Sequence, residues 1–291
     1  MKNTIFSLKT GLVAAMFSVS LLSAPVVHAS LVDGIVDTWS VGVSGQFADG
    51  SVNWRDGTGT IVSSTSLRWG DPAGNFGSSG LDITNQASPS LVNTNGAAVG
   101  NMFITHINRP IFSGTGSLES VTLASTLTLT PGTPAGYPGL PSATINFNIN
   151  FLETTNDPTN GICADGTLRS AAVNAGGCRD IFVVDKNALN FPFWYDLDGD
   201  LLDTTYQNQL YYISFFELTT GLNPLPAAAC TAVLGAGNNS CMGFRTAENA
   251  ETTVQFAALI TTTPVQIPEP GSLAILGLGL AGLGLVRRRR S

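Results

Sequence analysis

The sequence is poor in charged residues and in histidine, and these shortages exclude several classes of function. Charged residues make up 11 % of its 291 residues, against roughly 25 % in an ordinary soluble domain. Only two histidines occur, so a metal site would need carboxylate or thiolate partners. No Cys-x-x-Cys pair is present to supply thiolates at zinc spacing. A phosphate-binding loop of the form G-x-x-x-x-G-K-[ST] is also missing, which excludes a nucleotide enzyme of that type.

The middle of the chain also lacks any segment with a helical period of 3.6 residues. Strand patterns are frequent instead, and residues 143–151 alternate strictly between apolar residues and asparagine or threonine. Residues 210–218 are apolar on both faces, which predicts a central strand. Further strands are expected at residues 34–47, 60–69, 101–107, 118–130, 180–184 and 252–261. Eight to ten such strands predict one all-β domain, an antiparallel β-sandwich of jelly-roll or lectin-like type.

Both ends of the chain read as targeting segments rather than as parts of this domain. Residues 1–29 combine basic residues, an apolar stretch and a small-residue cleavage site, which predicts a secretory signal peptide with a signal helix. At the other end, Pro268-Glu269-Pro270 precedes apolar residues 272–286 and the basic cluster Arg287, Arg288, Arg289 and Arg290. Residues 272–286 predict a transmembrane helix about 22 Å long, which is short for a hydrocarbon core of about 30 Å. The predicted domain limits are therefore 1–29, 30–266 and 267–291.

This three-part C-terminus resembles a PEP-CTERM sorting signal. The resemblance implies a Gram-negative envelope, removal of the tail by an exosortase after a transient stay in the inner membrane, and release to the cell surface. Such proteins tend to accompany exopolysaccharide, extracellular-matrix and biofilm growth. The alternative is a C-terminal membrane anchor that is never cut.

Removing both targeting segments makes the exported domain strongly acidic. The formal charge of −7 includes six positive charges in those segments, so without them the exported domain carries about −13 if Glu269 is kept. An acidic surface repels phosphate backbones, and nucleic acid is therefore not an expected partner. Signal peptidase and exosortase are the expected processing partners, with exopolysaccharide as a further one.

Four cysteines remain after processing, and an even number in an exported chain indicates disulfides. Three pairings are possible, and sequence spacing favours the two local ones, Cys163–Cys178 and Cys230–Cys241. Each would stabilise the fold by roughly 2–3 kcal/mol in the chain-entropy model.

The segment Thr105-His106-Ile107-Asn108 contains the one histidine outside the signal peptide. In an extended strand His106 and Asn108 point to the same face. The segment is similar to the T-H-x-N motif of a family of PEP-CTERM proteins with no assigned activity. His106 is expected to be structural, its ring nitrogens bonded to loop backbone groups, with Asn108 capping the turn before Pro110. The alternatives are the base of a secreted hydrolase and a metal ligand.

Asp196, Asp198, Asp200 and Asp203 form an acidic cluster. Such carboxylates are solvated in a hairpin turn or share a hard cation such as Ca²⁺. The EF-hand register fails, so a calcium loop would be of another kind, with Asp180 or Asp185 as a distant ligand. The solvated turn is the preferred reading, and calcium is the only cofactor under consideration.

Four tryptophans either fill the sandwich core or form a sugar-stacking platform. Core packing is expected for each, least strongly for Trp194 beside the acidic turn. Glu119, Glu153 and Glu217 show no spacing that suggests a glycosidase pair. The sequence therefore predicts a non-enzymatic, exosortase-sorted surface or matrix protein with a structural or adhesive role. A calcium-dependent carbohydrate-binding module and a secreted hydrolase using His106 are the alternatives.

Overall fold

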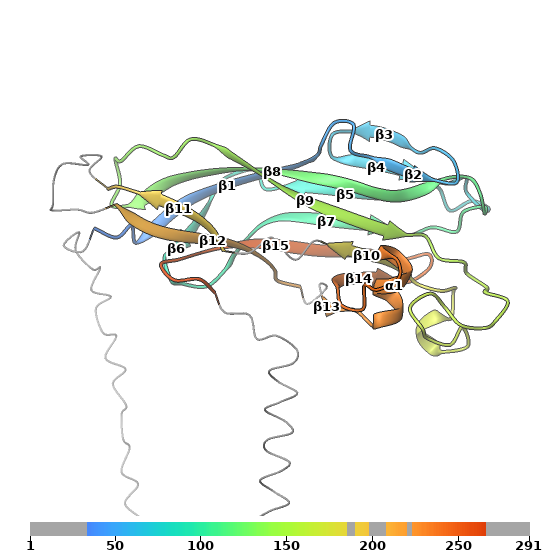
Figure 1. Ribbon diagram of the computed structural model, residues 1–291. Coiled ribbons are helices and arrows are strands. Elements are labelled where there is room, and N and C mark those ends of the chain that lie inside the picture. Colours follow the sequence, from blue (N-terminus) through green and yellow to red (C-terminus); the bar gives the residue numbers. More distant parts are fainter. Residues whose placement is uncertain (1–33, 185–189, 198–207, 220–222, 266–291) are drawn as a thin grey trace, which may run out of the picture.

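Two antiparallel β-sheets pack face to face in the computed structural model, which describes residues 34–184, 190–197, 208–219 and 223–265 (Figure 1). The first sheet, with order β13-β14-β10-β9-β8-β1-β6 and β2 beside β8, consists of β1 (Thr38–Phe47), β2 (Asn53–Arg55), β6 (Ser90–Asn93), β8 (Ser117–Thr133), β9 (Ala143–Leu152), β10 (Asp180–Val184), β13 (Asn223–Pro224) and β14 (Met242–Thr246). The second sheet, with order β11-β12-β15-β7-β5-β4-β3, consists of β3 (Thr60–Ser63), β4 (Ser66–Trp69), β5 (Ser79–Asn85), β7 (Val99–Ile107), β11 (Phe191–Tyr195), β12 (Gln209–Glu217) and β15 (Glu251–Thr261).

The predicted all-β sandwich is confirmed, and the expected strands are all present. The described ranges hold fifteen strands instead of eight to ten, because segments such as β2, β6 and β13 are too short to show an alternating pattern. The expected strand at residues 60–69 is a hairpin, β3 paired with β4. The strand expected to be central, β12, lies next to the edge strand β11.

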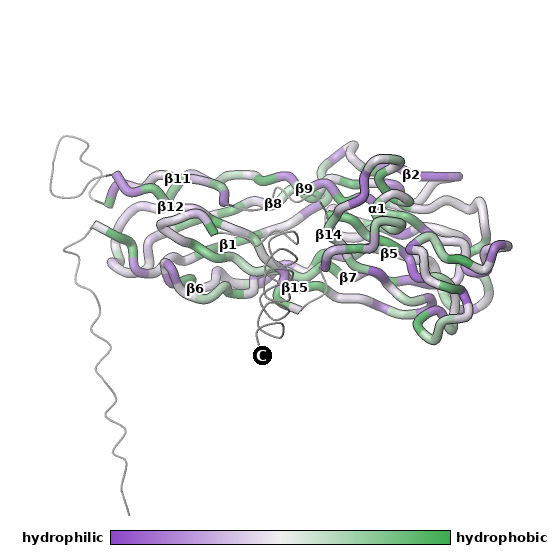
Figure 2. The backbone as a smooth tube through the Cα atoms, turned by 60° about the horizontal axis from the view of Figure 1, so that its bottom comes forward, coloured by the Kyte–Doolittle hydropathy of each residue, from purple (hydrophilic) through white to green (hydrophobic). Residues whose placement is uncertain are grey.

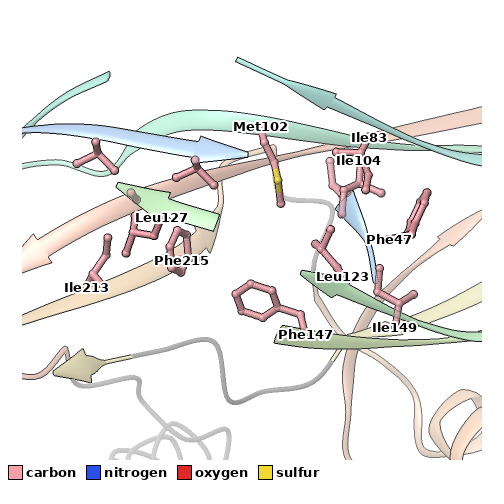
Figure 3. Packing of buried hydrophobic residues seen from close by; sticks show 14 of the residues in the cluster. Phe47, Ile83, Met102, Ile104, Leu123, Leu127, Phe147, Ile149, Ile213 and Phe215 are labelled. Atoms are coloured by element: carbon pink, nitrogen blue, oxygen red, sulfur yellow. The ribbon is translucent and has the colours of Figure 1, made fainter. Parts of the chain in front are cut away.

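The core lies between the two sheets and is made by alternate residues of each strand (Figure 3). Phe47, Leu123 and Phe147 come from the first sheet and face Met102 and other residues of the second. The rings of Phe147 and Phe215 meet across the two sheets with centroids 5.9 Å apart. Hydrophilic and hydrophobic residues alternate along the strands, as a half-buried sheet requires (Figure 2).

The structure contains a short α-helix that the sequence pattern does not predict. Helix α1 (Ala227–Leu234) begins after Pro226, and its uniformly small and apolar sequence lacks the polar face that would reveal a helical period. It packs through Ala229 and Cys230 against Ile181 and Val183 of β10, forming a second, smaller apolar cluster. The β11–β12 hairpin lies toward one end of the molecule, and α1 lies toward the other (Figure 1).

Candidate functional site

His106 lies in β7 with its side chain on the inner face of the second sheet, where it is fully buried. Its ring stacks on Trp69, with centroids 5.9 Å apart and planes 11° from parallel, and contacts Phe182 at 4.5 Å. Neither ring nitrogen has a hydrogen-bond partner. Burial lowers the pKa of His106 to about 3, so the imidazole is neutral. The expectation that it bonds loop backbone groups is wrong, because strand pairing directs it into the core.

Asn108 shares the inner face with His106, as predicted, and is also fully buried. Its Nδ2 donates to the backbone oxygen of Thr246 at 3.3 Å, and its own backbone N–H donates to Ala250 at 2.9 Å. The side chain therefore links the end of β7 to the end of β14 in the other sheet. Asn108 does not cap the turn before Pro110 in this way. Thr105 lies on the opposite face, where its Oγ1 is 2.9 Å from Oγ1 of Thr253.

Three carboxyl groups from different elements meet beside this aromatic stack. Glu153 follows β9, Asp180 begins β10, and Glu248 follows β14. The Nε1 of Trp69 donates to Oε2 of Glu153 at 3.1 Å. Asp180 is fully buried, and its Oδ1 accepts the backbone N–H of Thr154 at 2.8 Å. We call Glu153, Asp180 and Glu248 the carboxyl cluster.

The carboxyl cluster has many buried oxygen atoms and no basic partner among the residues that the structure describes. Asp180 Oδ2 and both carboxyl oxygens of Glu248 are buried without a hydrogen bond, as is Oγ1 of Thr246, directly opposite Asp180 in the ladder. Asn156 lies beside Glu248, since a Cβ on Gly177 would be 2.2 Å from Asn156 Oδ1 and 3.1 Å from Glu248 Cβ. No ion pair of the described residues includes a member of the cluster.

Burial raises the pKa of every group in the cluster, and repulsion by neighbouring carboxylates adds to this for Glu153 and Asp180. Burial, and then the charge of Glu248, raises the pKa of Glu153 to about 7. Burial and the charge of Glu153 raise the pKa of Asp180 well above its usual value, and burial raises that of Glu248. The cluster therefore holds protons near neutral pH. Within the described ranges, no three His, Cys, Asp or Glu side chains are arranged to hold a metal ion.

Little in the sequence indicates this cluster. Sequence patterns suggest Glu153 only as a candidate glycosidase residue and Asp180 only as a distant calcium ligand, and they do not point to Glu248. The three residues lie far apart along the chain, and each sits at the end of a different strand. Only the antiparallel pairing of β9, β10 and β14 brings them together.

The predicted calcium loop lies largely outside the described residues, which include Asp196 but not Asp198, Asp200 or Asp203. Its hairpin setting is confirmed, because Tyr195 of β11 pairs with Gln209 of β12 on the two sides of the loop. Calcium binding by these aspartates stays a prediction.

Both favoured disulfides are present. Cys163–Cys178 has a Cα–Cα distance of 5.5 Å, and Cys230–Cys241 has one of 5.6 Å. Inside the first loop, the buried Asp165 accepts hydrogen bonds from Arg179 at 2.9 Å and Arg245 at 2.7 Å. Burial alone would raise the pKa of Asp165, but bonds from Thr167 and Arg245 and the charge of Arg179 bring it below its usual value.

The tryptophans divide between core and surface. Trp39 and Trp69 are buried and Trp54 is half-buried, as expected of core residues. Trp194 in β11 is 56 % exposed and does not fill the core. Its exposure follows from the alternation of β11, in which Phe193 and Tyr195 occupy the inner positions.

The two predicted targeting segments, residues 1–29 and 267–291, lie outside the described residues. Within the described ranges, no helix has both the length and the apolar character to cross a membrane. In a comparison with known families, residues 266–290 match the model of the PEP-CTERM protein-sorting motif. No curated protein matches the chain. The motif marks this chain as an exported protein that is targeted by an exosortase and sorted to the cell surface.

Proposed function

We propose that the β-sandwich has a structural or adhesive role within, or bound to, the exopolysaccharide around the cell. The observation that carries this proposal is the sorting motif at residues 266–290, which directs the chain to the exosortase. In the proposed route the C-terminal helix holds the protein in the inner membrane only until the exosortase removes it. Signal peptidase removes residues 1–29 at the other end.

The chemistry of the domain supports a place outside the cytoplasm. Two disulfides persist only in an oxidising compartment. Each disulfide closes a loop at the end of the molecule that carries α1, where loops extend beyond the core between the two sheets. Low charge and a net negative domain favour glycans over nucleic acid as partners.

A non-enzymatic role fits the position of His106, the residue on which a hydrolase would depend. A general base must lie within hydrogen-bond reach of the proton it removes. The ring of His106 is enclosed by Trp69, Phe151 and Phe182, and neither nitrogen has a hydrogen-bond partner among the described residues. We therefore propose that the T-H-x-N segment packs the sandwich and joins its two sheets.

Carbohydrate binding by a lectin-like sandwich is a second candidate, and the exposed Trp194 favours it specifically. Its calcium-dependent form makes a separate prediction. Calcium should raise the melting temperature, and the pair Asp198→Asn and Asp200→Asn should abolish that rise. A wild-type melting temperature that is indifferent to calcium would remove calcium from this candidate.

The test of the proposed function is the intact mass and the mapped termini of the protein recovered from the host's surface, matrix and inner-membrane fractions. We expect a chain from about residue 30 to a cut near residues 268–271, found with the exopolysaccharide. A chain that keeps residue 291 and stays in the inner-membrane fraction would contradict the proposal and indicate an anchored domain.

A further inference from the structure

The outer face of the β11–β12 hairpin carries an uncharged aromatic surface. In the strand ladder Trp194 pairs with Leu210, and Pro192 pairs with Tyr212, so all four side chains share one face. Tyr212 pairs in turn with Thr261 of β15. Trp194 and Pro192 are exposed, and Leu210 and Tyr212 are half-buried. We call Pro192, Trp194, Leu210 and Tyr212 the aromatic face.

The inner-face residues of β11 and β12 anchor these two strands to the core. Phe193 stacks on Tyr211, with centroids 5.3 Å apart and planes 17° from parallel, and both rings contact Trp39 edge-on. The hydroxyl of Tyr195 donates to the backbone oxygen of Pro138 at 2.7 Å. Trp194 therefore stands between two anchored residues. Because the backbone around Trp194 is already ordered, a ligand that stacks on this residue binds with little further loss of conformational entropy.

The charge distribution of the protein favours an uncharged ligand over an anionic one. The aromatic face contains no Asp, Glu, Lys, Arg or His residue, and Thr261 beside it is also uncharged. All six arginines of the described ranges are already in ion pairs with carboxylates. The domain would therefore repel an anionic polymer, because its net charge is negative and its described arginines are already paired with carboxylates. The same net charge opposes close approach of a second copy.

We propose that the aromatic face binds the apolar face of sugar rings in a neutral polysaccharide. Sugar rings in such a chain present flat C–H surfaces, which pack on the planes of Trp194 and Tyr212, while their hydroxyl groups stay in water. Diagonal neighbours across two paired strands lie roughly 7–8 Å apart, so both aromatic rings contact one chain. This inference rests on the proposed function, because it names the class of glycan and the surface that binds it.

The test is native affinity electrophoresis of the processed protein in gels that contain the host's exopolysaccharide, separated by anion exchange into neutral and acidic fractions. We expect retardation by the neutral fraction and none by the acidic one. Trp194→Ala should weaken binding by roughly tenfold or more, as truncation of an exposed anchor tryptophan does. Phe112→Ala is the matched control, because Phe112 is 58 % exposed but lies off the aromatic face.

Several outcomes would overturn the inference. These are equal retardation of wild type and Trp194→Ala, retardation by the acidic fraction alone, and no retardation by the neutral fraction. Concentration-dependent dimerisation that Trp194→Ala abolishes would assign the face to a second copy instead. Equal melting temperatures of wild type and Trp194→Ala will show that the fold is retained. If the protein is found in the matrix but Trp194→Ala binds normally, the inference fails while the proposed function stands.

Discussion

At the residue scale, one tryptophan contacts both a neutral histidine and a proton-binding carboxyl cluster. Trp69 stacks on His106 and donates its Nε1–H to Glu153. The two groups affect stability in opposite directions as pH changes. The folded state lowers the proton affinity of His106 and raises that of Glu153. Their contributions oppose each other between about pH 4.5 and 6.5.

Removing the histidine should expose the contribution of the carboxyl cluster. Burial takes the pKa of His106 from 6.5 to about 3, so the unfolded state binds the proton more tightly, and this group lowers stability as pH falls below 6.5. By pH 5 the loss is about 2 kcal/mol. His106→Phe removes this loss and leaves no unpaired ring nitrogen. Its free energy of unfolding, measured in urea, should exceed that of wild type by more at pH 5 than at pH 7.5.

Nuclear magnetic resonance of the processed protein provides an independent check of the His106 prediction. His106 is the one histidine left once residues 1–29 are removed. Its ring signals should not shift between pH 8 and about pH 4. A titration near pH 6.5 would contradict the buried neutral state.

Removing a carboxyl group should have the opposite effect on pH dependence. The raised pKa of Glu153 means that the folded state binds the proton more tightly, so stability is lost as pH rises from about 4.5 through about 7. Glu153→Gln keeps an acceptor for Trp69 and should stabilise the protein by about 2 to 3 kcal/mol at pH 8. The gain should vanish near pH 4.5. Urea unfolding at several pH values will measure it.

The control for Glu153→Gln is Asp49→Asn, because Asp49 is exposed and follows β1. The free energy of unfolding of Asp49→Asn should differ from that of wild type by the same amount at every pH in this range. A gain for Glu153→Gln that is the same at pH 4.5 and pH 8 would show that Glu153 does not titrate with the cluster.

At the element scale, the end of the sandwich that carries α1 depends on close backbone contacts and on disulfides. Helix α1 has eight residues and no side-chain cap at its first turn, so it is too short to be stable alone. The Cys230–Cys241 disulfide joins it to the start of β14, and β14 pairs with both β10 and β13. The position of this helix therefore depends on how closely β14 lies against β10.

Gly243 in β14 should tolerate no side chain. A Cβ there would lie 1.8 Å from the backbone oxygen of Phe182 and 2.9 Å from Leu225 Cδ1. Gly243→Ala should therefore separate β14 from β10 and cost roughly 3 kcal/mol or more. Gly100→Ala in β7 is the matched control, because its nearest contacts are the flexible end of Gln255. Equal losses of stability in the two variants would contradict this account of Gly243.

At the scale of the whole molecule, one apolar core joins the two sheets. The main cluster includes residues of β1, β8 and β9 from one sheet and of β5, β7, β12 and β15 from the other. Neither sheet can separate without exposing the inner face of its partner. The domain should therefore unfold as a unit.

A chain of residues 30–266, made in an oxidising compartment, should show this cooperativity directly. We expect one unfolding transition that coincides by tryptophan fluorescence and by far-ultraviolet circular dichroism. Separate transitions would divide the predicted domain 30–266 into two. Limited proteolysis of the longer chain should likewise leave a core fragment within these limits.

The sequence alone was enough to predict the all-β class, the main strands, both disulfides and the sorting motif. Each of these rests on local information: the two-residue alternation of a half-buried strand, the short spacing of cysteine pairs, and a contiguous motif at residues 266–290. The shared face of His106 and Asn108 also follows from strand geometry. Helix α1 and the shortest strands were not predicted because uniform or very short segments carry no period, and the seven-residue strand β5 was not predicted either.

Tertiary structure decided which groups lie together. Glu153, Asp180 and Glu248 meet only because β9, β10 and β14 pair side by side. Strand pairing also directs His106 into an aromatic pocket and leaves Trp194 on the outer face. Contacts between residues far apart in the chain depend on strand order and register, which the pattern of a single strand does not encode.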